Sequence, residues 1–149
     1  MRRKWFSRRI CRLSSHSTLT AVAIRGVHMR SLNENHLVDV ASAEPGRLEQ
    51  WFKDRLPYSS SIKASYTLVG GRLDFLYKKP LAAVVYRSRE NRVNVLAWPV
   101  SKADRFPSPL LVDAGLKIMF WTSGNINFCA ISDLSQDEFI KFVNAFKGA

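Results

Sequence analysis

The chain has 149 residues and a formal net charge of +11, and 46% of its residues are hydrophobic. This length and hydrophobic content are typical of one globular domain and exclude an intrinsically disordered chain. The two cysteines, Cys11 and Cys129, do not form a disulfide framework or a C-x-x-C site, and no apolar run approaches the roughly 18 residues needed to cross a bilayer.

The positive charge is concentrated at the N-terminus. Residues 1–33 carry eight basic side chains and no acidic one, whereas residues 34–149 carry 15 basic and 12 acidic side chains, a net charge of only +3. We therefore interpret residues 1–33 as a basic leader, separable from a domain at residues 34–149. The leader has the composition of a targeting segment, a membrane-surface contact or a solvated extension. Nucleic-acid binding is not expected of the body, since such a domain needs a basic face of its own.

The first half of the chain predicts a strand followed by a helix. Thr18 to Leu32 predicts a short connecting helix within the leader, and the alternating stretch His36 to Ser42 predicts the first strand. Four apolar residues then recur at helical spacing, with Pro45 in the first turn and Pro57 as the end. These four are Leu48, Trp51, Phe52 and Leu56.

The second half predicts a sheet and a last helix. The short breaks 87–91 and 123–125 predict hairpins, whereas residues 101–115, with two prolines, predict a long surface connection. Ser135 and Glu138 form a capping box in front of an apolar helical stripe. The apolar runs that predict strands are 66–69, 73–77, 81–87, 93–100, 117–121 and 126–132. This order predicts one α+β domain, a mostly antiparallel curved sheet of about five to six strands with both helices packed on one face.

Gly70-Gly71 raises the question of a phosphate-binding loop. Such a loop needs glycines that lead into a helix, whose N-terminal N–H groups bind the anion. Here the pair leads into the alternating run that begins at Leu73. We interpret it as a bulge or a tight turn at the start of a strand, where glycine tolerates a positive φ.

The residue types that usually carry catalysis are sparse in the predicted domain. His16, His28 and His36 lie in the first quarter of the chain, and residues 37–149 contain no histidine, which removes Ser-His-Asp, Cys-His and zinc-protease chemistry from the body. Cys129 lies in an apolar run and predicts a buried thiol. We predict core packing for Trp51, Trp98 and Trp121. The sequence predicts no enzyme and no catalytic, metal-binding or cofactor-binding residue.

One alternative stays open. Asp39 and Asp74 lie in strand patterns, where solvent-facing positions are the default, and they would form a carboxylate pair if they faced each other. The alternative interpretation is a small-molecule-binding or hydrolytic domain that uses these carboxylates or Cys129.

Three stretches, 28–59, 68–99 and 120–139, resemble the C-terminal, extracytoplasmic domain of bacterial transmembrane anti-sigma factors. The shared pattern contains H-x-x-D-V-x-S, a Trp-Phe pair, L-V-G-G-R-L-x-x-L, P-x-A-x-x-V-Y, W-P, W-T-x-G and A-x-S-D-L in this order. The matching positions are His36, Asp39, Val40, Ser42, Trp51, Phe52, Leu68 to Leu73, Leu76, Pro80, Ala82, Val85, Tyr86, Trp98, Pro99, Trp121, Thr122, Gly124, Ala130 and Ser132 to Leu134.

The resemblance implies regulation without catalysis. It implies a sensor module that acts through protein–protein contacts in a sigma-factor pathway, on the extracytoplasmic side of the membrane. The sequence contains no counterpart of the family's H-x-x-x-C-x-x-C zinc motif or of its membrane helix, since Cys11 and His16 do not reproduce the spacing. For this chain we expect a protein partner, with contact to a membrane surface only through the basic leader.

Overall fold

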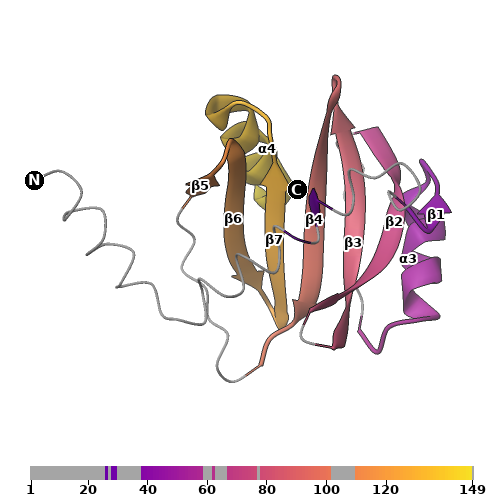
Figure 1. The fold of residues 1–149 in the computed structure, drawn as a ribbon. Coiled ribbons are helices and arrows are strands. Elements are labelled where there is room, and N and C mark those ends of the chain that lie inside the picture. The colour runs from indigo at the N-terminus through magenta and orange to yellow at the C-terminus, as the bar shows by residue number, and fades with distance from the viewer. Residues whose placement is uncertain are drawn as a thin grey trace, which may run out of the picture.

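The structure is a computed structural model that describes residues 26, 28, 29, 38–58, 62, 67–76, 78–101 and 110–148. Within these residues one open antiparallel sheet has seven strands in the order β1-β2-β3-β4-β7-β6-β5 (Figure 1). The strands are β1 (Val40–Ala41), β2 (Thr67–Leu76), β3 (Lys79–Ser88), β4 (Asn91–Pro99), β5 (Leu111–Asp113), β6 (Leu116–Ser123) and β7 (Ile126–Ser132), and the two long helices are α3 (Pro45–Lys53) and α4 (Gln136–Gly148). The predicted single α+β domain with an antiparallel sheet is confirmed.

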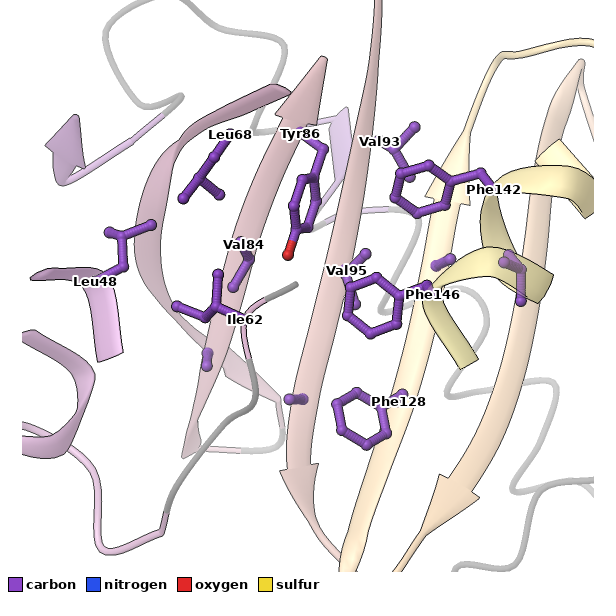
Figure 2. Packing of buried hydrophobic residues seen from close by; sticks show 14 of the residues in the cluster. Leu48, Ile62, Leu68, Val84, Tyr86, Val93, Val95, Phe128, Phe142 and Phe146 are labelled. Atoms are coloured by element: carbon purple, nitrogen blue, oxygen red, sulfur yellow. The ribbon is translucent and has the colours of Figure 1, made fainter. Parts of the chain in front are cut away.

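Both helices pack on one side of the sheet, which we call the helix face. Leu48 and Phe52 of α3 and Phe142 and Phe146 of α4 belong to a single apolar cluster together with the strand residues beneath them, such as Tyr86 (Figure 2). The periodic apolar residues of the sequence are the ones that are buried here, because a helix buries one stripe and a strand buries alternate residues. The predicted placement of both helices on one face is therefore confirmed.

The start of α4 follows the predicted capping box in part. The backbone N–H of Glu138 donates to Oγ of Ser135 at 3.4 Å, so the serine satisfies one N–H group of the first turn. The Glu138 carboxylate lies 3.4 Å from Nη1 of Arg89 in the β3–β4 turn. Leu134 and Phe139, which flank the cap, are both buried in the helix-face cluster, as a hydrophobic staple requires.

The sheet has seven strands instead of the predicted five to six, although two of the predicted runs merge into one strand. A three-residue strand, β5, forms inside the stretch that was predicted as a surface connection, and it pairs with β6 through a turn at Ala114 and Gly115, both with positive φ. The runs 66–69 and 73–77 are one strand, β2, which continues through the glycine pair. The prolines had suggested a loop where β5 lies, and the glycine pair had suggested a break within β2.

A register shift in β2 lies between Leu68 and Gly70, at the start of the glycine pair, as the predicted bulge requires, but neither glycine has a positive φ. Glycine is needed at both positions because neighbouring parts of the chain approach the backbone of β2 closely. A Cβ atom on Gly71 would lie 2.7 Å from the ring of Phe52, and one on Gly70 would overlap the carbonyl oxygen of Val40 in β1. The glycines let α3 and β1 lie against β2, so their role is structural.

We expect Gly70→Ala to lower the free energy of unfolding by about 2–3 kcal/mol, because the backbone of β1 must move away. Gly71→Ala should cost about 1–2 kcal/mol, since the Phe52 ring has more freedom to shift. Gly46→Ala in α3 is the matched control, because its Cβ meets nothing within 4 Å. It should be neutral or stabilising. Urea unfolding of the three variants measures this order, and equal stabilities would contradict the close-approach explanation.

Candidate functional site on the second face of the sheet

The opposite side of the sheet, which we call the second face, is built by strand register. Paired residues of antiparallel strands point to the same side, so the pairs define rows across the sheet. One row runs through Arg72, Ala83, Leu96, Cys129 and Phe120. The next contains Val85, Asn94, Ile131 and Ile118. Polar side chains from β2 and β4 thus lie within an otherwise apolar surface.

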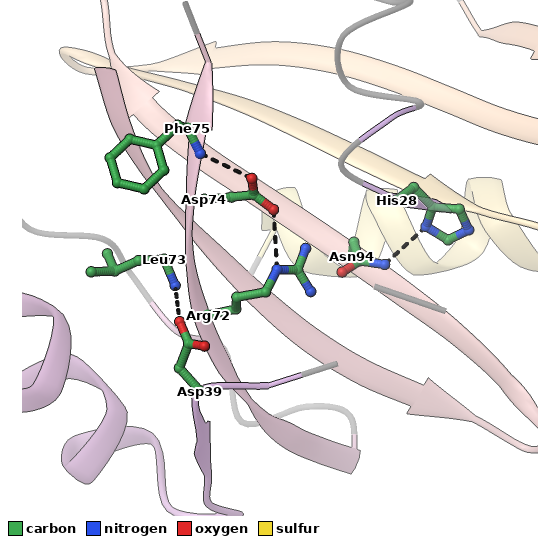
Figure 3. Close-up of polar contacts among 7 residues, drawn as sticks. All are labelled: His28, Asp39, Arg72, Leu73, Asp74, Phe75 and Asn94. Carbon is green, nitrogen blue, oxygen red and sulfur yellow. Dashed lines mark hydrogen bonds and ion pairs between the residues drawn. The ribbon is translucent and has the colours of Figure 1, made fainter. Parts of the chain in front are cut away.

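The apolar part of the second face forms a cluster of its own, made by strand residues. Its buried members are Leu76, Leu81, Ala83, Leu96, Trp98, Leu116, Ile118, Phe120, Cys129 and Ile131. Neither α3 nor α4 contributes to it, since their buried side chains belong to the helix-face cluster. Among the residues that the structure describes, the helical Gly26, His28 and Met29 lie ahead of the sheet in sequence and place one side chain, His28, against this face (Figure 3).

An ion pair is buried at the β2 end of the second face. Nε of Arg72 lies 3.1 Å from Oδ2 of Asp74, and the two residues are only 4% and 8% exposed. Residues two apart on a strand point to the same side, which brings the two side chains together. A buried pair of this kind holds charge at a fixed place, and each partner depends on the other for compensation.

His28 and Asn94 form the second polar contact of this face. Nδ2 of Asn94 lies 2.9 Å from Nδ1 of His28, and both residues are buried, His28 to 1% exposure (Figure 3). With the Asn94 amide as donor, Nδ1 accepts and the imidazole is neutral. Burial is the main cause that lowers the pKa of His28 to about 4; the Asp133 carboxylate raises it and the Arg72 guanidinium lowers it further.

His28 belongs to the predicted leader, ahead of the predicted domain boundary at residue 34, yet it is buried on the sheet. Apart from Gly26 and Met29, the rest of the predicted connecting helix, together with Cys11, His16 and His36, lies outside the described residues. The resemblance began at this histidine, but no reason from local chemistry had singled it out. Asn94 carried a stronger signal, because it is a polar residue inside the apolar run 93–100.

The carboxylates of the alternative interpretation have separate structural uses. Oδ2 of Asp39 accepts from the backbone N–H of Leu73 at 2.9 Å, and Oδ1 of Asp74 accepts from the N–H of Phe75 at 2.9 Å (Figure 3). These two N–H groups belong to β2 beyond the short β1, which pairs only with Gly70 and Gly71. The aspartates therefore satisfy backbone donors at the edge of the sheet, a position that otherwise invites another strand.

Cys129 is fully buried in the middle of the second face, and burial raises the pKa of its thiol well above the usual value. A thiol in this environment stays protonated at neutral pH. Trp98 and Trp121 are buried as predicted, whereas Trp51 is half-buried with Cζ of Arg55 4.3 Å from the centre of its ring. The predicted packing roles are thus found for two tryptophans fully and for the third in part.

Three further observations bear on the site. Among the described residues, no three His, Cys, Asp or Glu side chains are grouped so that they could hold a metal ion. None of the helices in the described part of the chain is long and apolar enough to cross a membrane. Comparison of the chain with models of protein families, with curated proteins and with solved structures found no match.

Proposed function

We propose that this chain is a non-enzymatic regulatory or sensor module that acts through protein–protein contacts, like the outer domain of a transmembrane anti-sigma factor. The observation that carries the proposal is the second face of the sheet. It carries a buried apolar cluster to which neither α3 nor α4 contributes, and it holds a buried charged pair. A largely apolar surface with few fixed polar groups suits recognition of a protein segment when it is uncovered.

The use of the chemistry-bearing side chains is consistent with this proposal. Asp39 and Asp74 accept hydrogen bonds from backbone N–H groups, and Cys129 is enclosed in the apolar cluster. Each residue of the alternative hydrolytic interpretation therefore has a structural reason to be present. This arrangement gives no specific support to a reaction, so we keep the regulatory interpretation alone.

The resemblance supports the identity of the partner. Many of its shared positions are places where the fold needs that residue type, such as Gly71 beneath Phe52. Ser132, another shared position, donates from Oγ to the carbonyl of Arg92 and accepts from the N–H of Leu134 where β7 leads into α4. By the same resemblance, the partner is a component of a sigma-factor pathway on the extracytoplasmic side of the membrane.

A genetic experiment tests the proposal. The gene is deleted, and transcription from a promoter of the extracytoplasmic-function sigma factor encoded nearest to it is measured with a reporter. We expect a change of several-fold that the full chain restores. Asp39→Asn, which keeps an oxygen acceptor for the Leu73 N–H, and Cys129→Ala should restore it equally well.

Two results would contradict the proposal. The first is a reporter that does not respond to deletion, with a housekeeping promoter as the reference. The second is failure of Asp39→Asn or Cys129→Ala to restore the response although the variant protein is as stable as the natural one. This second result would favour the hydrolytic interpretation, because only chemistry at these groups would then distinguish the variants.

A further inference from the structure

One end of the sheet brings together two elements that are distant in sequence, the turn between β2 and β3 and the end of α3. Tyr58, shortly after α3, places its Oη 3.2 Å from the carbonyl oxygen of Pro80. Pro80 lies in β3 directly opposite Phe75 of β2. Figure 1 shows the end of α3 and the β2–β3 turn at the same end of the sheet. We call residues 51–58, 75, 76 and 78–80 the basic end.

The charge of the domain is concentrated at the basic end. It carries four basic side chains and one acidic one, all exposed, which are Lys53, Arg55, Lys78, Lys79 and Asp54. Its net charge of +3 equals that of the whole stretch 34–149, where the remaining basic and acidic residues are equal in number. The basic end is therefore a positive patch on a domain that is otherwise balanced in charge.

Aromatic rings lie among these cations. Phe75 is 60% exposed, and its ring points away from the carboxylate of Asp74, which is on the other side of β2 (Figure 3). The half-buried ring of Trp51 has Cζ of Arg55 4.3 Å from its centre. A single exposed ring is ordinary on a protein surface, but a ring surrounded by cations at one end of a domain calls for a ligand that is both anionic and apolar.

We propose that the basic end binds the surface of an anionic lipid bilayer. Lys78 and Lys79 in the β2–β3 turn reach the lipid phosphates with their ammonium groups, and the ring of Phe75 enters the boundary between headgroups and acyl chains. Arg55 contributes a further cation from the end of α3. The sequence predicts membrane contact for the basic leader only, so this is a second, separate membrane site, in the domain itself.

The hydrogen bonds of β2 disfavour an extended protein segment as the occupant. A strand added at this edge would need the backbone N–H groups of Leu73 and Phe75 as donors. These groups already donate to the carboxylates of Asp39 and Asp74, each at 2.9 Å. The edge next to the basic end is thus protected against strand addition, whereas a bilayer requires only side chains.

NMR of the natural full chain tests the proposal by position. The chain is bound to nanodiscs of phosphatidylcholine and phosphatidylglycerol that contain a nitroxide-labelled lipid. The amide signals of Phe75, Lys78 and Lys79 should broaden more strongly than those of Arg89 and Glu90 in the β3–β4 turn, at the opposite end of the sheet. Because each position is observed separately, binding through the leader does not obscure the result.

Vesicle sedimentation with charge variants measures the contribution of the lysines. The double variant Lys78→Gln/Lys79→Gln should bind vesicles of phosphatidylcholine and phosphatidylglycerol about 25-fold more weakly, roughly five-fold for each cation near the surface. Arg87→Gln/Arg89→Gln is the matched control, since it also removes two charges from a hairpin, and Arg89 has a positive φ like Lys78. At physiological salt it should lose less than about three-fold.

A second pair of variants measures the contribution of the aromatic ring. Phe75→Ala should weaken vesicle binding about ten-fold, the low end of what the burial of such a ring contributes. Val112→Ala is the control, because Val112 is 58% exposed in β5 at the other edge of the sheet. It should bind as the natural chain does. All four variants change exposed side chains and should unfold at nearly the same urea concentration.

Four results would each overturn the proposal. They are equal losses in the two double variants, equal binding to vesicles of phosphatidylcholine alone, no loss in Phe75→Ala, and broadening in the β3–β4 turn as strong as that at the basic end. If Lys78→Gln/Lys79→Gln lost affinity for soluble polyglutamate while the nitroxide lipid left the basic end unchanged, the patch would bind an acidic protein segment instead. These tests involve no sigma-factor component, so their outcome is independent of the proposed function.

Discussion

Replacing Phe142 with alanine is expected to lower the free energy of unfolding by about 3–5 kcal/mol. Phe142 is 2% exposed and its ring packs against two others, with its centre 5.7 Å from that of Tyr86 and 6.1 Å from that of Phe146. Truncation removes this burial and leaves a cavity that α4 cannot close, because Phe139, Val143 and Phe146 hold the helix on the same cluster. Urea or thermal unfolding followed by circular dichroism measures the loss.

The matched control is Asn144→Ala on the same helix. Asn144 is exposed, so its replacement should change stability by less than about 0.5 kcal/mol. If Phe142→Ala also cost less than about 0.5 kcal/mol, the packing of α4 on the helix face would be wrong. A comparable loss in both variants would instead point to the helical propensity of α4 as the origin.

The fold was predictable wherever a local pattern agreed with the tertiary structure. The stripe of α4, the apolar run of β3 and the turn at Gly124 all depend on residues near one another in the chain, and all were recognised. Strand β5 was missed because three residues carry too short an alternation, and its pairing with β6 defines it. The continuity of β2 was missed because glycine in a strand usually marks an interruption, whereas here it makes room for Phe52.

The second face was less predictable, because it depends on contacts between distant segments. The buried state of both faces is visible in the sequence only as continuous apolar runs, which a central strand of any sheet can show. All three histidines precede residue 37, and the leader that contains His28 was interpreted as separate from the domain. The contact between His28 and Asn94 was therefore not expected. The ion pair of Arg72 and Asp74 had a local signal, opposite charges two residues apart on a strand, that was not used.

This ion pair leads to the second large effect. We expect Asp74→Asn to lower the free energy of unfolding by about 3 kcal/mol, because it removes the carboxylate charge that lies 3.1 Å from Nε of Arg72 in a site that is almost closed to water. The asparagine keeps an oxygen that can accept from the N–H of Phe75, so the edge of β2 is preserved and the change isolates the charge. Urea unfolding at pH 7 is the measurement.

Glu138→Gln provides the matched control, because it removes the same charge from an ion pair at the surface. Nη1 of Arg89 lies 3.4 Å from this carboxylate, and the Arg89 side chain is 85% exposed, so water and salt screen the interaction. Glu138→Gln should lower the free energy of unfolding by less than about 1 kcal/mol, and this loss should be smaller still in 1 M salt. The loss caused by Asp74→Asn should persist in 1 M salt. Equal losses in the two variants would contradict the burial of the Arg72–Asp74 pair.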